Sequence, residues 1–156
     1  MRKFALLPAL CALLLSGCMI APIAPPTAPP ASARDEVRAF TELVNEHRKK
    51  VGCRPLTWVS AVAVVAQRHS EEMAALGFFS HTNLQGETPF ARLRKAGIQY
   101  TMAAENIAEG QRTAEQVLAS WLSSRGHRRN IEDCAFRQHG IGMEQNRWTH
   151  MFVTLR

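Results

Sequence analysis

The stretch SWLSSRGHRRNI, residues 120–131, ends an apolar helix-like run and then places a histidine directly after a glycine, among arginines. A histidine in this setting can be a ligand, a proton carrier or an ordinary surface residue. The residue types in this stretch do not distinguish among these roles, so the role of the histidine has to be inferred from the rest of the sequence.

Hydrophobic periodicity indicates helices upstream of this stretch. Apolar residues recur at steps of three and four over residues 37–51 and 62–76, and a glycine follows each run. A Thr-Pro pair predicts the start of a short helix over residues 88–97, and a capping-box pattern predicts the start of another at residue 113.

The last twenty residues change period. Residues 140–143 and 148–155 alternate in the manner of strands, with a turn near residues 145–147, and residues 107–108 are a further candidate strand. Helices first and strands last predict an α+β domain with an antiparallel sheet covered by helices.

The N-terminus has the pattern of an export signal. Two basic residues precede a short apolar run, residues 4–15, which is too short for a membrane span. The sequence LSGC at residues 15–18 resembles the lipobox of bacterial lipoproteins, which implies cleavage after residue 17 and attachment of lipid, palmitate included, to Cys18. The alternative is an ordinary signal peptide with a chance cysteine.

We therefore expect three parts: a signal peptide at residues 1–17, a Pro/Ala-rich linker at residues 18–33 and a folded domain at residues 34–156. An extended linker of this composition spans up to about 50 Å. The lipid would anchor the domain to the cell envelope, at the outer membrane if the source has two membranes, because Met19 replaces the aspartate of an inner-membrane retention signal.

Two cysteines remain after the leader and the lipidated residue are set aside. Cys53 and Cys134 form an even pair in an oxidising compartment, so we predict a disulfide between them. Two free thiols or a metal pair are the alternatives.

The charge of the chain limits the classes of partner that it is expected to bind. Without its leader the chain has 17 basic and 13 acidic side chains. Two basic clusters, residues 92–95 and 125–129, have no aromatic residues interleaved, so we expect no nucleic-acid partner. We interpret them mostly as solvated faces that attract anionic envelope polymers.

Three polar segments are candidates for chemistry: residues 78–81, residues 105–110 and the stretch that contains His127. None matches a local metal signature such as HExxH or CxxC. Spacing alone therefore favours structural roles for the histidines.

The order of these segments resembles the bacterial branch of the CAP superfamily, which is named for cysteine-rich secretory proteins, insect venom allergens and plant pathogenesis-related proteins. Its module is also called the SCP domain. The matching segments are FSH at 79–81, ENIA at 105–108 with Gly110, and WLSSRGHRRNI at 121–131, with further likeness at 45–48, 52–58, 136–142 and 148–152. The resemblance covers nearly all of residues 36–153 and implies an α-β-α sandwich.

The resemblance also implies a site. Family members line one cleft with a histidine after the second helix, the glutamate of an E-N motif and the histidine of a G-H motif, which match His81, Glu105 and His127. Many members have a second glutamate where this chain has Ser124, which puts the four-residue version of the site in doubt. His81 and His127 would bind zinc, with Glu105 orienting a bound water or accepting its proton. Gly126 would turn the chain so that His127 enters the cleft.

Structural roles remain as alternatives for these residues. His81 could cap a helix end, and Glu105 could anchor backbone amides. We expect Asn106 to be a hydrogen-bonding loop residue and His69 to be a satisfied core histidine. A hydrolase built on Ser124 and His127 lacks a nucleophile elbow or oxyanion-hole pattern in the sequence.

Two functions follow. The first, which we favour, is a monomeric, anchored binding module for a lipid or sterol-like, cell-wall or protein ligand. The second is a zinc-dependent hydrolase of peptide or cell-wall bonds that uses the same cleft. The sequence does not decide whether the protein is an enzyme.

Overall fold

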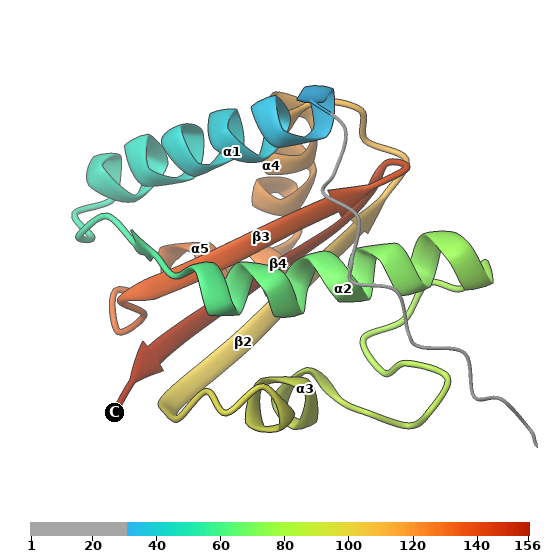
Figure 1. The fold of residues 1–156 in the computed structure, drawn as a ribbon. Coiled ribbons are helices and arrows are strands. Elements are labelled where there is room, and N and C mark those ends of the chain that lie inside the picture. Colours follow the sequence, from blue (N-terminus) through green and yellow to red (C-terminus); the bar gives the residue numbers. More distant parts are fainter. Residues whose placement is uncertain (1–30) are drawn as a thin grey trace, which may run out of the picture.

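The computed structural model describes residues 31–156, so the predicted leader, Cys18 and most of the linker lie outside the described residues. The first helix begins at Ala31, within the segment predicted as linker. The elements are α1 (Ala31–Lys50), β1 (Thr57–Trp58), α2 (Ser60–Leu76), α3 (Pro89–Lys95), β2 (Tyr100–Glu109), α4 (Ala114–Ser123), α5 (Arg125–Glu132), β3 (Gln138–Glu144) and β4 (Arg147–Leu155) (Figure 1).

The four strands form one sheet in the order β1-β3-β4-β2. The β2–β4 and β3–β4 pairs are antiparallel, and the short β1 adds a parallel pair that the sequence analysis did not predict. The predicted turn is a two-residue hairpin in which Gln145 and Asn146 both have positive φ. The predicted α+β class is confirmed.

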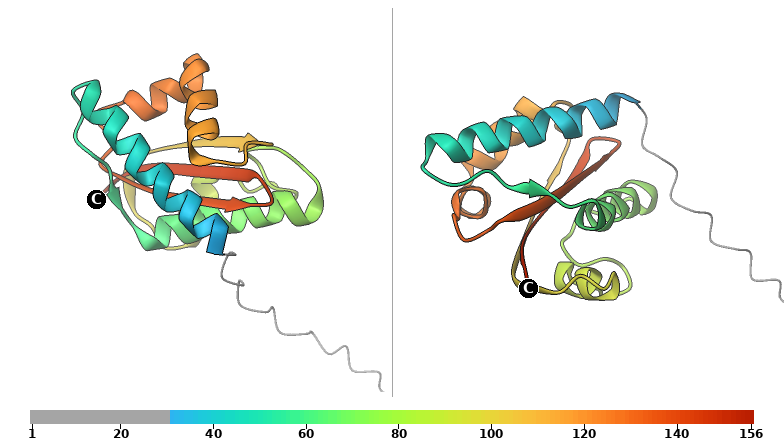
Figure 2. Two further views of the ribbon diagram at one scale, coloured as in Figure 1. Left: turned by 90° about the horizontal axis from the view of Figure 1, so that it is seen from above. Right: turned by 60° about the vertical axis from the view of Figure 1, so that its left-hand side comes forward.

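Helices cover both faces of the sheet (Figure 2). Successive side chains of β4 alternate between the faces. Trp148 and Phe152 pack into a core beneath α1, α4 and α5, whereas Met151 and Val153 pack into a second core with α2 and α3. The sandwich therefore has two hydrophobic cores separated by the sheet.

Two glycines let α2 pack closely against β3. A Cβ at Gly140 would lie 2.2 Å from the backbone nitrogen of Ala63, and one at Gly142 would lie 2.3 Å from the Cα of Gln67. The backbones of the helix and the strand are thus in direct contact, which fixes where α2 ends and where the loop after it begins.

A buried arginine and a disulfide close one end of the domain. Arg48, at the end of α1, is fully buried and donates hydrogen bonds to the carbonyls of Arg54, Ile131, Asp133 and Phe136. The predicted Cys53–Cys134 disulfide is present beside it. Together they hold the C-terminal end of α1 against α5.

The predicted helix starts are confirmed. Thr88 accepts a hydrogen bond from the backbone N–H of Ala91 with Pro89 in the first turn, and Thr113 accepts one from the N–H of Gln116. None of the helices within residues 31–156 is both long enough and apolar enough to span a membrane.

Candidate functional site

The candidate site lies at the outer edge of the sheet, along β2. Two consecutive residues of this edge strand, Glu105 and Asn106, point to opposite faces. Glu105 contacts α3 and the loop after α2, whereas Asn106 contacts α5. The strand therefore organises groups from both helical layers at one edge.

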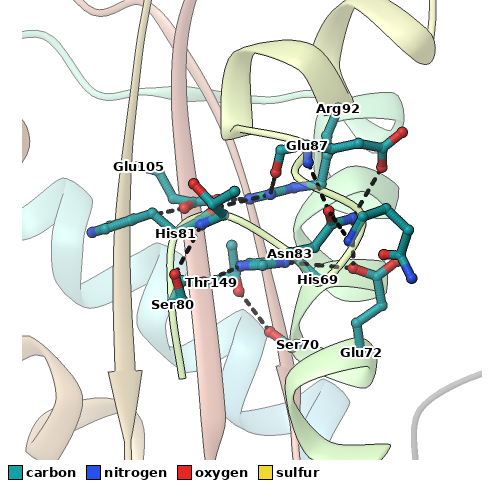
Figure 3. A network of polar contacts seen from close by, with 12 residues as sticks. His69, Ser70, Glu72, Ser80, His81, Asn83, Glu87, Arg92, Glu105 and Thr149 are labelled. Carbon is teal, nitrogen blue, oxygen red and sulfur yellow. Dashed lines mark hydrogen bonds and ion pairs between the residues drawn. The ribbon is translucent and has the colours of Figure 1, made fainter. Parts of the chain in front are cut away.

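Glu105 is the buried centre of this arrangement, with a side chain that is only 2% exposed. Its Oε1 is 2.7 Å from Nδ1 of His81, and its Oε2 accepts a hydrogen bond of 2.6 Å from Nη2 of Arg92 (Figure 3). Both carboxylate oxygens thus have short, charge-assisted hydrogen bonds. The alternative in which Glu105 anchors backbone amides does not describe these contacts, because its partners are side chains.

The contact to Glu105 fixes how His81 presents its ring. A carboxylate only accepts hydrogen bonds, so Nδ1 of His81 must carry the proton. The other ring nitrogen, Nε2, then has a free lone pair in a neutral imidazole. Because the His81 side chain is 51% exposed, this lone pair is accessible to a ligand.

Polar contacts of Arg92 and Asn83 hold the loop that carries His81, residues 77–88 (Figure 3). Arg92 donates to the backbone carbonyls of His81 and Glu87 as well as to Glu105. Asn83 accepts hydrogen bonds from the backbone N–H groups of Gln85 and Glu87. Arg92 therefore fixes both the carboxylate and the loop that brings the imidazole to it.

His69 supports the same loop from α2. It is fully buried, and its Nε2 is 2.8 Å from the carbonyl oxygen of Ser80. Burial is the main cause that lowers its pKa, with Arg92 adding to the effect. The neutral ring donates from Nε2 to Ser80, while Nδ1 is buried without a hydrogen-bond partner, 3.7 Å from Glu72. His69 is thus a core histidine, as predicted, but only one of its ring nitrogens is satisfied.

The third predicted residue, His127, is positioned through its backbone. The side-chain nitrogen of Asn106 donates to the His127 carbonyl at 3.0 Å, and Asn130 donates to the side-chain oxygen of Asn106 at 2.8 Å. Asn106 is thus a strand residue that ties α5 to β2, rather than the loop residue expected from the sequence.

The environment of His127 favours the neutral imidazole. Partial burial lowers the pKa of His127, and the charge of nearby His81 lowers it further. The ring also lies beside the Trp121 ring, with centroids 6.4 Å apart. A neutral ring has a lone pair, so His127 can act as an acceptor or a ligand.

The prediction for Gly126 was wrong. The helix break occurs at Ser124, whose backbone is extended, and Gly126 lies inside α5 without a positive φ. Asn106 and Asn130 hold α5 against the sheet edge, so the chain does not need a glycine turn to position His127. The neighbouring arginines 125, 128 and 129 are exposed, as expected.

A metal in this cleft would have few protein ligands. Within residues 31–156 no group of three or more histidine, cysteine, aspartate or glutamate side chains is arranged to hold a metal ion. The donors that remain for a metal are Nε2 of His81 and the ring of His127, two side chains whose charges interact. Glu105 would accept a hydrogen bond from Nδ1 of His81 and hold the ring in place, as carboxylates often do for metal-bound histidines.

Sequence reasoning missed Arg92 and Asn130. The signal for Arg92 was an arginine beside the buried Leu93 in a short amphipathic helix, where a charge needs a buried partner. Its partner lies 13 residues away on another element, so no local pattern paired them.

Comparison with known families agrees with this fold. The model of the CAP cysteine-rich secretory protein family matches residues 41–155. The chain therefore belongs to the CAP family.

Individual relatives are bacterial. The chain is 34% identical over 129 residues to the protein YkwD of Bacillus subtilis, covering 81% of this chain and 50% of that protein. It resembles the crystal structure of an extracellular SCP-domain protein from Bacillus anthracis, with TM-score 0.77, 28% identity, and coverage of 84% of this chain and 45% of that one. An outer surface protein from Borrelia burgdorferi shares the fold, with TM-score 0.73, 20% identity, and coverage of 80% and 96%. The chain thus spans about half the length of YkwD.

Proposed function

We propose that this protein is an exported, lipid-anchored CAP domain that acts as a binding module through the cleft formed by His81, Glu105 and His127. The signal-like N-terminus with Cys18 supports export and anchoring. The similar Bacillus anthracis protein is described as extracellular, and the Borrelia protein as an outer surface protein, which is consistent with export.

One observation carries the proposal for the cleft: the short contacts from Arg92 to Glu105 and from Glu105 to His81. They leave Nε2 of His81 open while His127 lies close by. Two imidazoles at a sheet edge suit a divalent ion such as zinc, or a ligand with hydrogen-bond donors. Zinc would supply a Lewis-acidic anchor for an anionic or carbonyl group of the ligand.

The ligand class is suggested by two exposed aromatic side chains that are close in sequence to His81 and Arg92. Phe79, two residues before His81, is 47% exposed, and Phe90 at the start of α3 is 41% exposed. Exposed aromatic rings beside a polar centre fit a ligand that is apolar with a polar end, such as a lipid or a sterol-like molecule.

The hydrolase is the less favoured alternative because of Glu105. A general base must be free to accept a proton from an attacking water. Both oxygens of Glu105 already accept hydrogen bonds from His81 and Arg92, and the side chain is buried. Hydrolysis through Glu105 would require one of these two contacts to open.

A zinc titration tests the proposal. We expect calorimetry on the purified protein to show about one zinc per chain. His81→Ala and His127→Ala should each abolish the binding, while His47→Ala should retain it, because His47 pairs with Glu132 away from the cleft. Circular dichroism would verify that each variant is folded.

The outcomes separate the possibilities. Zinc binding that depends on both histidines, without turnover of peptide or cell-wall substrates, supports the binding module. Zinc-dependent turnover that is lost in Glu105→Gln would establish the hydrolase instead. If the parent protein binds no zinc, or if His47→Ala is as damaging as the cleft variants, the metal-binding part of the proposal is wrong.

A further inference from the structure

A second surface, away from the cleft, is strongly basic. It lies where the C-terminal end of α1 meets α5, as Figure 2 shows. His47 of α1 is 2.9 Å from Glu132 of α5, and the Cys53–Cys134 disulfide joins the segments that follow both helices. Residues far apart in the sequence therefore contribute to one surface.

The centre of this surface is a stripe of arginines on α5. Arg125, Arg128 and Arg129 recur at steps of three and four, so they share one face of the helix. All three are exposed, and with Glu132 and Asp133 they line a hollow of about 340 Å³. Within residues 31–156 none of the three guanidinium groups has an ion-pair or hydrogen-bond partner.

Further basic residues extend the stripe. Lys49 and Lys50, in the last turn of α1, and Arg54, in the loop after it, are exposed. We call these three residues and the three arginines of α5 the basic surface. The acidic residues at this end are Glu46, Glu132 and Asp133.

The basic residues at this end of the molecule outnumber the acidic ones. Leaving aside the buried Arg48, the six basic residues of the basic surface and the three acidic residues beside them give this end a net charge of +3, whereas all of residues 31–156 together carry +4. Glu132 already has a hydrogen-bond partner in His47. Most of the excess positive charge thus lies at this one end, which raises the local concentration of anions.

We propose that the basic surface binds a linear polymer that carries phosphate groups. A guanidinium fork donates two parallel hydrogen bonds to a phosphate, and three unpaired arginines in a row fit successive phosphates of a chain. The open hollow gives such a chain room to lie along the arginines. The proposal is independent of the cleft and of the metal.

The test uses inorganic polyphosphate as the probe and the full chain purified in detergent. The triple variant Arg125→Gln, Arg128→Gln, Arg129→Gln removes the stripe. The matched control, Arg68→Gln, Arg94→Gln, Arg112→Gln, removes the same charge from exposed arginines elsewhere. Binding is measured by calorimetry at several salt concentrations.

We expect the stripe variant to lose at least about tenfold in affinity, with a salt dependence weaker by about one unit of slope per arginine. The control should change affinity by less than about threefold, because it keeps the local cluster. Glycerophosphoglycerol, a soluble lipid headgroup with one phosphate, should compete only weakly.

Three results would overturn the proposal. The parent protein could fail to bind polyphosphate at low salt. The two triple variants could lose affinity equally, which would reduce the effect to net charge. The single headgroup could compete as well as the polymer at equal phosphate concentration, which would point to lipid headgroups instead.

Discussion

Removing Arg92 should destabilise the protein more than any other change to a single charged side chain at the cleft. Its guanidinium donates to Glu105 and to the carbonyls of His81 and Glu87, and only 7% of the side chain is exposed. Arg92→Met would leave a buried carboxylate with one partner and the His81 carbonyl without its donor, while the Glu87 carbonyl would keep the backbone N–H of Asn83.

The size of the effect follows from burial. Breaking a buried ion pair by removing one partner typically lowers the free energy of unfolding by about 3–5 kcal/mol. We expect a loss in this range at pH 7. Replacing Glu105 by glutamine in the same chain removes the uncompensated charge, so the double variant should recover at least about 1 kcal/mol relative to additivity.

Urea unfolding followed by tryptophan fluorescence measures these differences, since Trp121 and Trp148 are buried. Arg94→Met is the control, because Arg94 is an exposed arginine of the same helix and should change stability by less than about 0.5 kcal/mol. If Arg92→Met changes stability by under about 1 kcal/mol, or if its effect simply adds to that of Glu105→Gln, Arg92 does not organise the site as described.

Three further predictions concern the scaffold. Gly142→Ala should destabilise by about 1–3 kcal/mol in chemical denaturation, because its Cβ would overlap the backbone of α2, whereas Gly126→Ala has open space and should be neutral or stabilising. Burial lowers the pKa of His139 to about 4, so the folded state binds fewer protons than the unfolded chain, which titrates near pH 6.5. The contribution of the neutral His139 to the free energy of unfolding should therefore be fully present above about pH 6.5 and fall by about 3 kcal/mol as the pH drops to 4. Thermal unfolding at several pH values would show this fall. His139→Gln should make the dependence of stability on pH weaker. Replacing Cys53 and Cys134 by alanine should lower the free energy of unfolding by about 4 kcal/mol, and a loss below about 1 kcal/mol would contradict the constraint that we assign to the disulfide.

Periodicity and caps predicted α1 to α4 and the final hairpin because these elements carry strong local signals. The apolar faces of α1 and α2 repeat at helical spacing, and Thr88 and Thr113 cap their helices as expected. The hairpin turn contains Asn146, a residue that tolerates positive φ.

Other elements were not predictable for identifiable reasons. β1 has only two residues, which is too short for any alternation to be seen. β2 extends back to Tyr100, but its first half lies at the exposed sheet edge, so its apolar alternation is diluted. The exposed face of α5 is a row of arginines and its interior includes Gly126, so its helical pattern was weak.

Some residues of the candidate site were expected from the sequence, and others were not. His81, Glu105 and His127 were expected from the family resemblance, and the structure places the first two in direct contact with His127 close by. Arg92 and Asn130 act through contacts between elements that are distant in sequence, so they required the fold. The roles of all five in binding a ligand stay predictions.

The binding site depends above all on how Glu105 orients His81, with Nε2 facing a ligand. Nitrogen NMR of the histidine rings measures this orientation, because it distinguishes the two tautomers of a neutral imidazole. We expect His81 to carry its proton on Nδ1, Glu105→Gln to weaken this preference, and zinc to shift Nε2 of His81 together with a ring nitrogen of His127. A His81 ring protonated on Nε2, or zinc that shifts neither ring, would show that Glu105 does not set the orientation of His81 for a ligand.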